Sequence, residues 1–271
     1  MQVYRKHLLD VSMVIVLINL SAVSAGFESR DLDWPAASAN IRVVGVPQLS
    51  RTLSNPALFY QQGRRGIEIS YGSLFSGLGI SSRSVAANMQ IKDIPLIVSM
   101  NLTGDDFYQE INLRMGYPFV LDSILTFGLR TDLHRIEVGD AFNRSTVTLS
   151  PTLHYELTPN IHFGSSFEHL VQLKEGFRVP QQFHFGVAFM FSHASLSMAF
   201  EKESVHPLEI GLGLEIQPFQ SFHLGVGYRD KSGTISSGWK LQGERYSLYY
   251  TFIYHPQLPN SHGLGLVLTL P

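Results

Sequence analysis

The stretch from Tyr246 to Leu270 restricts the fold of this chain more than any other part of the sequence. Tyrosine, leucine and phenylalanine occupy every second position from Tyr246 to Tyr254, and leucine does so from Leu264 to Leu270. Between these runs, residues 255–260 carry two prolines and break the pattern. A period of two is that of a β-strand, in which successive side chains point to opposite faces. The stretch therefore predicts a β-hairpin with one strongly hydrophobic face.

The opposite face of the last strand shows where the hydrophobic face points. Gly263, Gly265, Val267 and Thr269 alternate with the leucines and are small or weakly polar. A soluble β-sandwich would bury the leucine face, whereas an outer-membrane barrel turns such a face to lipid and places aromatic residues near the headgroups.

The first 25 residues predict a secretory signal peptide. Arg5, Lys6 and His7 form a basic start, residues 11–20 are mostly apolar, and Val23-Ser24-Ala25 ends in small residues suited to cleavage. A membrane-spanning helix needs about 20 apolar residues, so the apolar run is too short for an anchor. Export follows from this pattern.

Composition narrows the class of exported protein. The chain has no cysteine, so it is no disulfide scaffold, and its net charge of −2 gives no basic surface for nucleic acid. Charged residues make up 15% of the chain, glycine numbers 23, and no later segment is apolar for the length of a spanning helix. These features favour a β-barrel in the outer membrane of a Gram-negative-type bacterium, surrounded by outer-membrane lipid.

Residues 26–65 show no strand alternation. Trp34, Leu53, Leu58 and Phe59 are poor residues for a solvated tail, since disordered segments are depleted in large hydrophobic side chains. We expect a periplasmic arm or a plug folded into the lumen, followed by a barrel over residues 66–271.

The barrel region contains fourteen alternating segments, an even number as in bacterial single-chain barrels. They lie at residues 67–71, 85–91, 96–102, 111–117, 125–129, 147–157, 161–167, 183–191, 196–200, 208–216, 222–228, 235–241, 246–254 and 264–270. Three segments alternate less clearly than the rest, so twelve strands is the alternative. Short connections at 92–93, 118–123, 158–160, 192–193, 218–220 and 243–245 fall on the periplasmic side if the N-terminus is periplasmic. The longer ones, at 72–82, 134–144, 170–181 and 255–262, fall on the outer side, as this architecture requires.

Two stretches resemble the PorV/PorQ group of outer-membrane proteins, which is related to the FadL-type transporters of hydrophobic compounds. Residues 53–59, which include Asn55, Pro56, Ala57 and Phe59, are similar to an Asn-Pro-Ala motif that follows the N-terminal segment in both groups. The chain end, from Tyr250 to Leu270, is similar to the PorV/PorQ terminus. The resemblance implies a fourteen-stranded barrel and makes the Asn-Pro-Ala stretch a candidate plug motif.

The strand phase places a set of polar residues on the lumen side, opposite the hydrophobic phase. They are Glu68, Arg114, Arg130, Asp132, His154, Glu156, His162, Glu168, His184, Glu209, Glu215, His223 and Arg229. A polar lumen is normal for this architecture. Convergence of His and Glu on a metal ion is a weaker alternative without supporting spacing, and so is a hydrolase built from Ser150, His154 and Asp132. We predict no catalytic residue, cofactor or metal ligand.

Seven lumen-phase glycines leave two interpretations open. They are Gly186, Gly211, Gly213, Gly225, Gly227, Gly263 and Gly265. Such glycines either make room for a ligand or for the backbone of a plug, or relieve curvature in a tight barrel.

Two functions follow as expectations. The resemblance to PorV/PorQ implies a non-enzymatic accessory of protein secretion or surface attachment, with secreted proteins or secretion machinery as partners. The FadL-type relationship implies a passive route for small hydrophobic molecules, which is the alternative.

Overall fold

We describe the protein from a computed structural model, which covers residues 32–45, 48–59, 65–91, 94–139, 142–174, 176–204 and 206–270. The predicted signal peptide and residues 26–31 and 60–64 lie outside this part of the chain. The short helices are η1 (Trp34–Ser38), α2 (Leu49–Ser54) and η2 (Pro56–Leu58). The strands are β1 (Gly66–Leu74), β2 (Ile80–Ile91), β3 (Ile94–Gly104), β4 (Tyr108–Val120), β5 (Leu125–Val138), β6 (Phe142–Thr158), β7 (Ile161–Glu168), β8 (Val171–Lys174), β9 (Gln182–Met190), β10 (Ala194–Glu203), β11 (Glu209–Phe219), β12 (Phe222–Arg229), β13 (Ile235–Gln242), β14 (Tyr246–Tyr254) and β15 (Ser261–Thr269).

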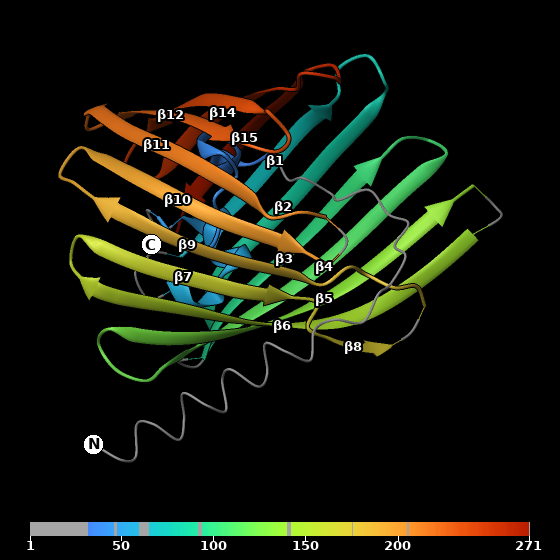
Figure 1. The fold of residues 1–271 in the computed structure, drawn as a ribbon, viewed down its shortest axis with the longest axis horizontal. Helices are drawn as coiled ribbons and strands as arrows, with labels where there is room; N and C mark the ends of the chain where they lie inside the picture. The colour runs from blue at the N-terminus through green and yellow to red at the C-terminus, as the bar shows by residue number, and fades with distance from the viewer. Residues whose placement is uncertain are drawn as a thin grey trace.

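Fourteen of these strands form a closed antiparallel barrel (Figure 1). Each of the fourteen strands pairs with the next one along the chain, with β7 pairing with β9 because β8 lies outside the ring, and β1 closes the ring by pairing with β15. The predicted number of fourteen strands is confirmed, and twelve is excluded. Among the described residues, no helix is long and apolar enough to cross a membrane.

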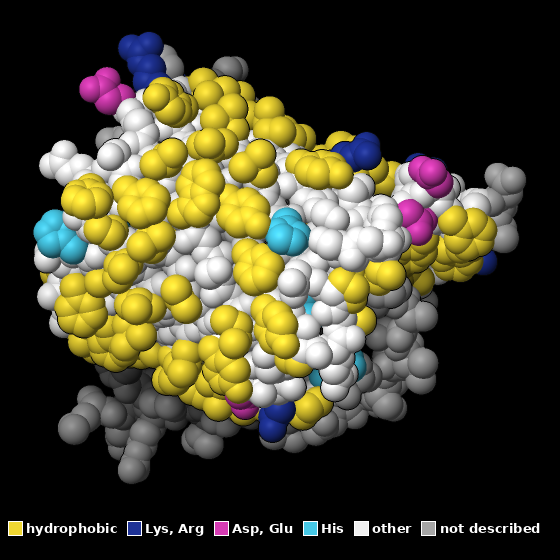
Figure 2. Space-filling view, turned by 90° about the horizontal axis from the view of Figure 1, so that it is seen from above, with side chains coloured by type: hydrophobic (Ala, Val, Ile, Leu, Met, Phe, Trp, Pro, Cys, Tyr) yellow, Lys and Arg dark blue, Asp and Glu magenta, His cyan; other side chains and the backbone are white. Residues whose placement is uncertain are grey.

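The predicted alternation is clear along most strands of the barrel, whereas Gly186, Val187 and Ala188 of β9 are buried in succession. In β11, for example, Gly211, Gly213 and Glu215 are buried inside while Leu212, Leu214 and Ile216 are exposed. Figure 2 shows hydrophobic side chains spread over one side of the barrel, with Lys, Arg, Asp and Glu at its margins. Exposure of so large a continuous hydrophobic surface to water is unfavourable. Such a surface suits the hydrocarbon core of a bilayer.

The strands run further than the sequence predicts. β1 extends to Leu74, and β2 already begins at Ile80. In the same way, β5 extends to Val138, and β6 already begins at Phe142. The predicted outer breaks at 72–82 and 134–144 are therefore mostly strand. Polar residues near the strand ends hid these extensions, because they interrupt the hydrophobic alternation while the backbone ladder continues.

The additional strand β8 marks a change in pairing beside Pro151. β6 pairs with β7 up to Thr152 and with β8 from Leu149, while its ladder to β5 passes Pro151 without a shift. Proline lacks the backbone N–H that a ladder needs, so the interruption falls on the edge where its nitrogen cannot donate. The irregularity beside Pro151 is therefore confined to the edge of β6 that faces β7 and β8.

The described N-terminal residues lie inside the barrel (Figure 1). Trp34, Ile41, Leu49 and Leu58 are among the most deeply buried side chains of the protein. η1 packs on β11 to β14, and η2 packs on β4 to β6, on the opposite wall. We refer to residues 32–45 and 48–59 together as the plug.

Candidate functional site

A large cavity opens at the end of the barrel that carries the connections after β1, β3 and β5, which we call the outer end. Its volume is about 950 Å³. Most of the lining side chains are hydrophobic and come from strands on several sides of the barrel, among them Leu74, Ile80, Ile136, Val138, Phe142 and Phe177. A concave, mostly apolar space of this size fits a small hydrophobic molecule.

The inner end of this outer cavity lies against the plug. Leu74 lines the cavity and also forms a buried cluster with Leu32 and Ala36 of the plug, to which Phe75 and Ile80 add partly buried surface. Leu74, Phe75 and Ile80 therefore lie between the cavity and the plug, because they line the cavity on one side and pack with Leu32 and Ala36 on the other.

A smaller polar cavity of about 330 Å³ adjoins the outer cavity. The two share His206, Lys231 and Ser232 in their linings, and the smaller one also includes Glu209 and Arg229. The outer end therefore presents an apolar chamber with a charged rim on one side.

Lumen glycines admit the plug backbone. A Cβ added at Gly227 would lie 1.9 Å from the amide nitrogen of Ala39, and one at Gly164 would lie 1.8 Å from the carbonyl oxygen of Val43. Any larger side chain would collide with the plug at these positions. Of the two interpretations of the glycines, close approach of a plug explains Gly186, Gly213, Gly225, Gly227 and Gly263, whereas Gly265 faces the Tyr249 ring and Gly211 has only ordinary contacts.

The Asn-Pro-Ala stretch docks on the β4–β5 wall. Asn55 accepts a hydrogen bond from the Ala57 amide and donates from Nδ2 to the carbonyl oxygens of Val43 (2.8 Å) and Leu153 (3.1 Å). Pro56 fills the space that Gly116 leaves, since a Cβ there would lie 2.6 Å from its ring. Phe59 packs beside Leu49 and Leu53. These residues therefore pack within the plug or hold it against the barrel wall. That they have a role in function stays a prediction.

A buried ion pair fixes the middle of the plug to the wall. Arg51 of α2 pairs with Glu215 of β11, which also accepts hydrogen bonds from Ser38 (2.8 Å) and Trp34 (3.3 Å). The side chains of Arg51 and Glu215 are 1% and 8% exposed. Removal of one buried charge leaves the other without compensation, so this contact resists displacement of the plug.

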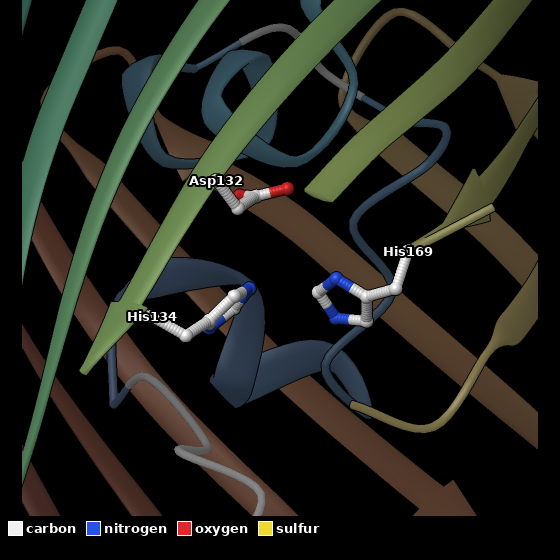
Figure 3. A group of neighbouring side chains, drawn as sticks. All are labelled: Asp132, His134 and His169. Atoms are coloured by element: carbon white, nitrogen blue, oxygen red, sulfur yellow. The ribbon is translucent and has the colours of Figure 1, made fainter. Parts of the chain in front are cut away.

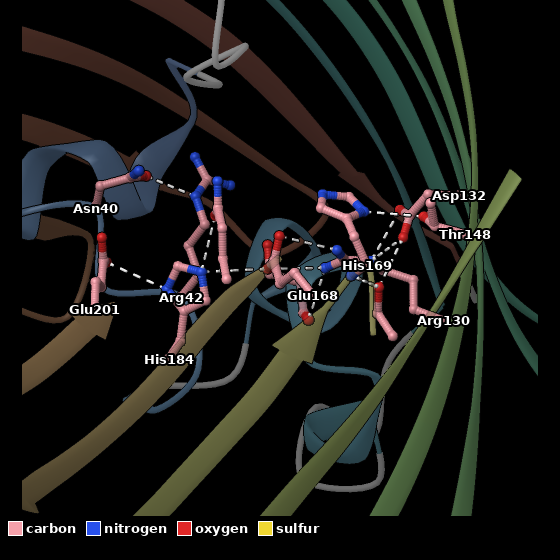
Figure 4. Close-up of polar contacts among 12 residues, drawn as sticks. Asn40, Arg42, Arg130, Asp132, Thr148, Glu168, His169, His184 and Glu201 are labelled. Carbon is pink, nitrogen blue, oxygen red and sulfur yellow. Dashed lines mark hydrogen bonds and ion pairs between the residues drawn. The ribbon is translucent and has the colours of Figure 1, made fainter. Parts of the chain in front are cut away.

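Further charges form a continuous belt across the lumen (Figure 4). Arg130 pairs with Asp132 (2.9 Å) and with Glu168 (3.1 Å), and His184 lies between Glu168 (3.9 Å) and Glu201 (3.5 Å). Arg229 then pairs with Glu201 and with Glu209 (2.8 Å).

Both arginines of the belt also donate to the plug backbone. Arg130 donates to the carbonyl of Ser54 (3.0 Å), and Arg229 donates to the carbonyl of Ala39 (3.0 Å). The belt therefore holds the plug at two points, Ala39 and Ser54.

The predicted lumen residues all occupy inward positions, but they form separate groups. Arg114, Arg130 and Asp132 cluster on β4 and β5, with Arg114 Nε 3.6 Å from Asp132. Nδ1 of His162 and Nε2 of His154 lie 3.3 Å apart. Glu156 and His223 lie near the opposite, inner end of the barrel. The alternative hydrolase triad does not assemble, because Ser150 donates to Asp132 (3.1 Å) and His154 contacts His162.

Sequence reasoning missed several charged residues of the lumen. Arg51 lies in a segment without strand alternation, so no phase indicated its direction. Glu201 and Lys240 follow the lumen phase of β10 and β13, and extension of that phase would have found them. The alternation predicts a strand that ends before His134, which places His134 in a loop, and His169 follows β7 at a turn that no pattern marks.

Comparison with known proteins gives similarity of fold. No protein-family model and no curated protein sequence matches the chain. Three solved structures match 87% of this chain and 96% of their own: the monoaromatic hydrocarbon channel CymD (TM-score 0.66, 10% identity), the Ralstonia pickettii toluene transporter TbuX (0.63, 10%) and the Pseudomonas putida toluene transporter TodX (0.62, 11%). The Acinetobacter baumannii outer membrane protein Omp33 matches with a TM-score of 0.53. The chain therefore has the barrel fold of outer-membrane channels, and its structural neighbours include a monoaromatic hydrocarbon channel and two toluene transporters.

Proposed function

We propose that this protein is a passive outer-membrane channel for small hydrophobic molecules. The observation that carries the proposal is the largely apolar outer cavity of about 950 Å³ inside a closed barrel, where Leu74 lies between the cavity and the plug. A hydrophobic molecule gains free energy when it leaves water for such a chamber, roughly 25 cal/mol for each Å² of apolar surface buried. The chamber therefore concentrates dilute hydrophobic compounds at the entrance of the barrel.

The structural neighbours support this alternative over the secretion accessory. CymD is described as a hydrocarbon channel and TbuX and TodX as toluene transporters, and none of the three is an accessory of secretion. They are also channels and transporters rather than enzymes. The wide match to their barrels, together with the apolar cavity, makes transport of a compound of that chemical kind the function best supported.

Uptake of labelled toluene by cells that express the protein tests the proposal. We expect expression to raise the initial uptake rate at limiting toluene, and Phe177→Asp to abolish most of that gain, because Phe177 lines the cavity from a loop and a charge there makes the chamber polar. Phe107→Asp is the matched control, since Phe107 is also a loop phenylalanine, is 67% exposed and does not line the cavity.

Native mass spectrometry and crosslinking of the gently purified protein separate the two functions. A bound hydrophobic molecule that Phe177→Asp releases supports the channel. Unchanged toluene uptake, together with exported proteins crosslinked to an empty barrel, would instead establish the secretion accessory.

A further inference from the structure

Three potential metal ligands converge on the lumen side of β5, at the end of the charge belt. Asp132 and His134 are two residues apart on β5 and share its inward face, and His169 follows β7 on the other side of β6. Their ligand atoms all lie within 4.8 Å of one another. Figure 3 shows the two imidazole rings next to each other near the Asp132 carboxylate, and their planes meet edge to face at 74°.

His134 presents a buried lone pair to this group. Its Nδ1 lies 2.5 Å from Oδ1 of Asn112, and an amide oxygen only accepts, so Nδ1 carries the proton. The neutral ring then has its lone pair on Nε2, which is buried and has no hydrogen-bond partner among the described residues. A buried acceptor without a donor costs free energy, and coordination of a metal ion would satisfy it.

His169 is held in place by its surroundings. Its backbone adopts φ = +57°, its amide donates to Oγ of Ser150 (3.0 Å), and its Nδ1 lies 2.9 Å from Oγ1 of Thr148. Hydrogen bonds to the second ring nitrogen orient most metal-binding histidines in this manner. The backbone of a non-glycine residue enters the left-handed region at a cost, which the surrounding contacts must offset.

Asp132 supplies the carboxylate. Its Oδ2 accepts from Ser150 and Arg130, which fixes the group, while Oδ1 has no hydrogen bond within the described part of the chain and lies 2.9 Å from the Arg130 guanidinium. Glu168 also pairs with Arg130. Two carboxylates, those of Asp132 and Glu168, therefore lie beside the positive charge of this guanidinium.

The charges around the three ligands determine which ion they favour. Asp132 and Glu168 formally balance Arg114 and Arg130, which leaves no excess negative charge to attract a cation. The two imidazoles must therefore provide the selectivity. Imidazole nitrogen suits Zn²⁺, Ni²⁺ and Cu²⁺, whereas Ca²⁺ and Mg²⁺ require oxygen ligands.

We propose that Asp132, His134 and His169 form a binding site for a divalent transition-metal ion of the zinc type. Bonds of about 2.0–2.2 Å would place two ligand atoms at most about 4.3 Å apart, so small side-chain rotations close the site. The ion would join β5 to the chain beyond β7, next to the wall segment where β8 replaces β7 on β6. His134 is two residues from Ile136 on β5, and Ile136 lines the outer cavity. The proposed metal site does not depend on which molecule the channel carries.

Titration of the full-length barrel in detergent, after treatment with EDTA, tests the site. We expect one Zn²⁺ per chain by calorimetry and one Co²⁺ with the visible absorption of a low-coordinate nitrogen and oxygen site. His134→Ala and His169→Ala should each weaken Zn²⁺ binding at least about tenfold, since even loss of a residue that only orients a ligand has an effect of that order. His154→Ala is the matched control, because His154 also faces a second histidine in the lumen but belongs to no group of three ligands.

Two results would overturn the proposal, and the first needs only the wild-type protein. The site is absent if the folded, heat-modifiable wild-type barrel binds neither Zn²⁺ nor Co²⁺ in stoichiometric amount. It is also absent if wild type, His134→Ala and His154→Ala bind Zn²⁺ with equal affinity. If an alanine variant fails to fold, Thr148→Val replaces it, since that change removes only the hydroxyl that faces His169 Nδ1 and should still lower the affinity severalfold.

Discussion

At the scale of single residues, the absence of a side chain is what allows the plug to dock. Gly227 and Gly211 lie on neighbouring strands of the same wall, yet a Cβ would meet Ala39 at 1.9 Å from the first and at 3.7 Å from the second. We expect Gly227→Ala to destabilise the protein by about 1–3 kcal/mol, the usual cost of overpacking, and to expose the plug to added protease. Gly211→Ala should change neither quantity appreciably. Urea unfolding in lipid and limited proteolysis measure both, and equal behaviour of the two variants would show that the plug does not press on this wall.

At the scale of one element, β11 separates two environments with a period of two. Leu212 and Leu214 face outward, while Gly211 and Glu215 face the lumen and the plug. Leu212→Arg should lower the free energy of unfolding by about 2–4 kcal/mol if the position is near the middle of the bilayer, because the guanidinium enters hydrocarbon. Leu212→Phe keeps the face apolar, and Gly211→Ser lies on the inner face, so both should be mild. Reversible unfolding in phospholipid vesicles gives the three values. Equal losses of unfolding free energy for Leu212→Arg and Gly211→Ser would show that the assignment of the lipid face and the lumen face is wrong.

At the scale of the whole molecule, the plug and the closed ring together decide what passes. Deletion of residues 32–59 removes the Arg51–Glu215 pair and the carbonyls that Arg130 and Arg229 bind, but no strand of the ring. Because a barrel of this size is too wide for wall side chains alone to fill, we expect the shortened protein to admit small sugars. Swelling of liposomes in arabinose should be severalfold faster with the deletion than with the intact chain. A variant that assembles, shows heat-modifiable mobility and leaves swelling unchanged would mean that the wall itself blocks the lumen.

The sequence by itself determined the ring and its two faces. Alternation of large apolar residues from Ile67 to Leu270 reports the environment of each position directly, since side chains of a strand point to opposite sides. Counting these segments was therefore enough to predict fourteen strands and an inward set that includes Arg130, Asp132 and Glu215.

Only the tertiary structure decided how the inward residues combine. Arg51 meets Glu215, and His169 approaches His134 and Asp132, across distances in the sequence that no local pattern encodes. The closure of the ring and the path of the plug set these contacts, and both depend on long-range pairing and on glycines such as Gly227 that admit another backbone. The alternation tells which side of the wall a residue occupies, whereas its partner across the lumen is fixed by geometry that exists only once the barrel has closed.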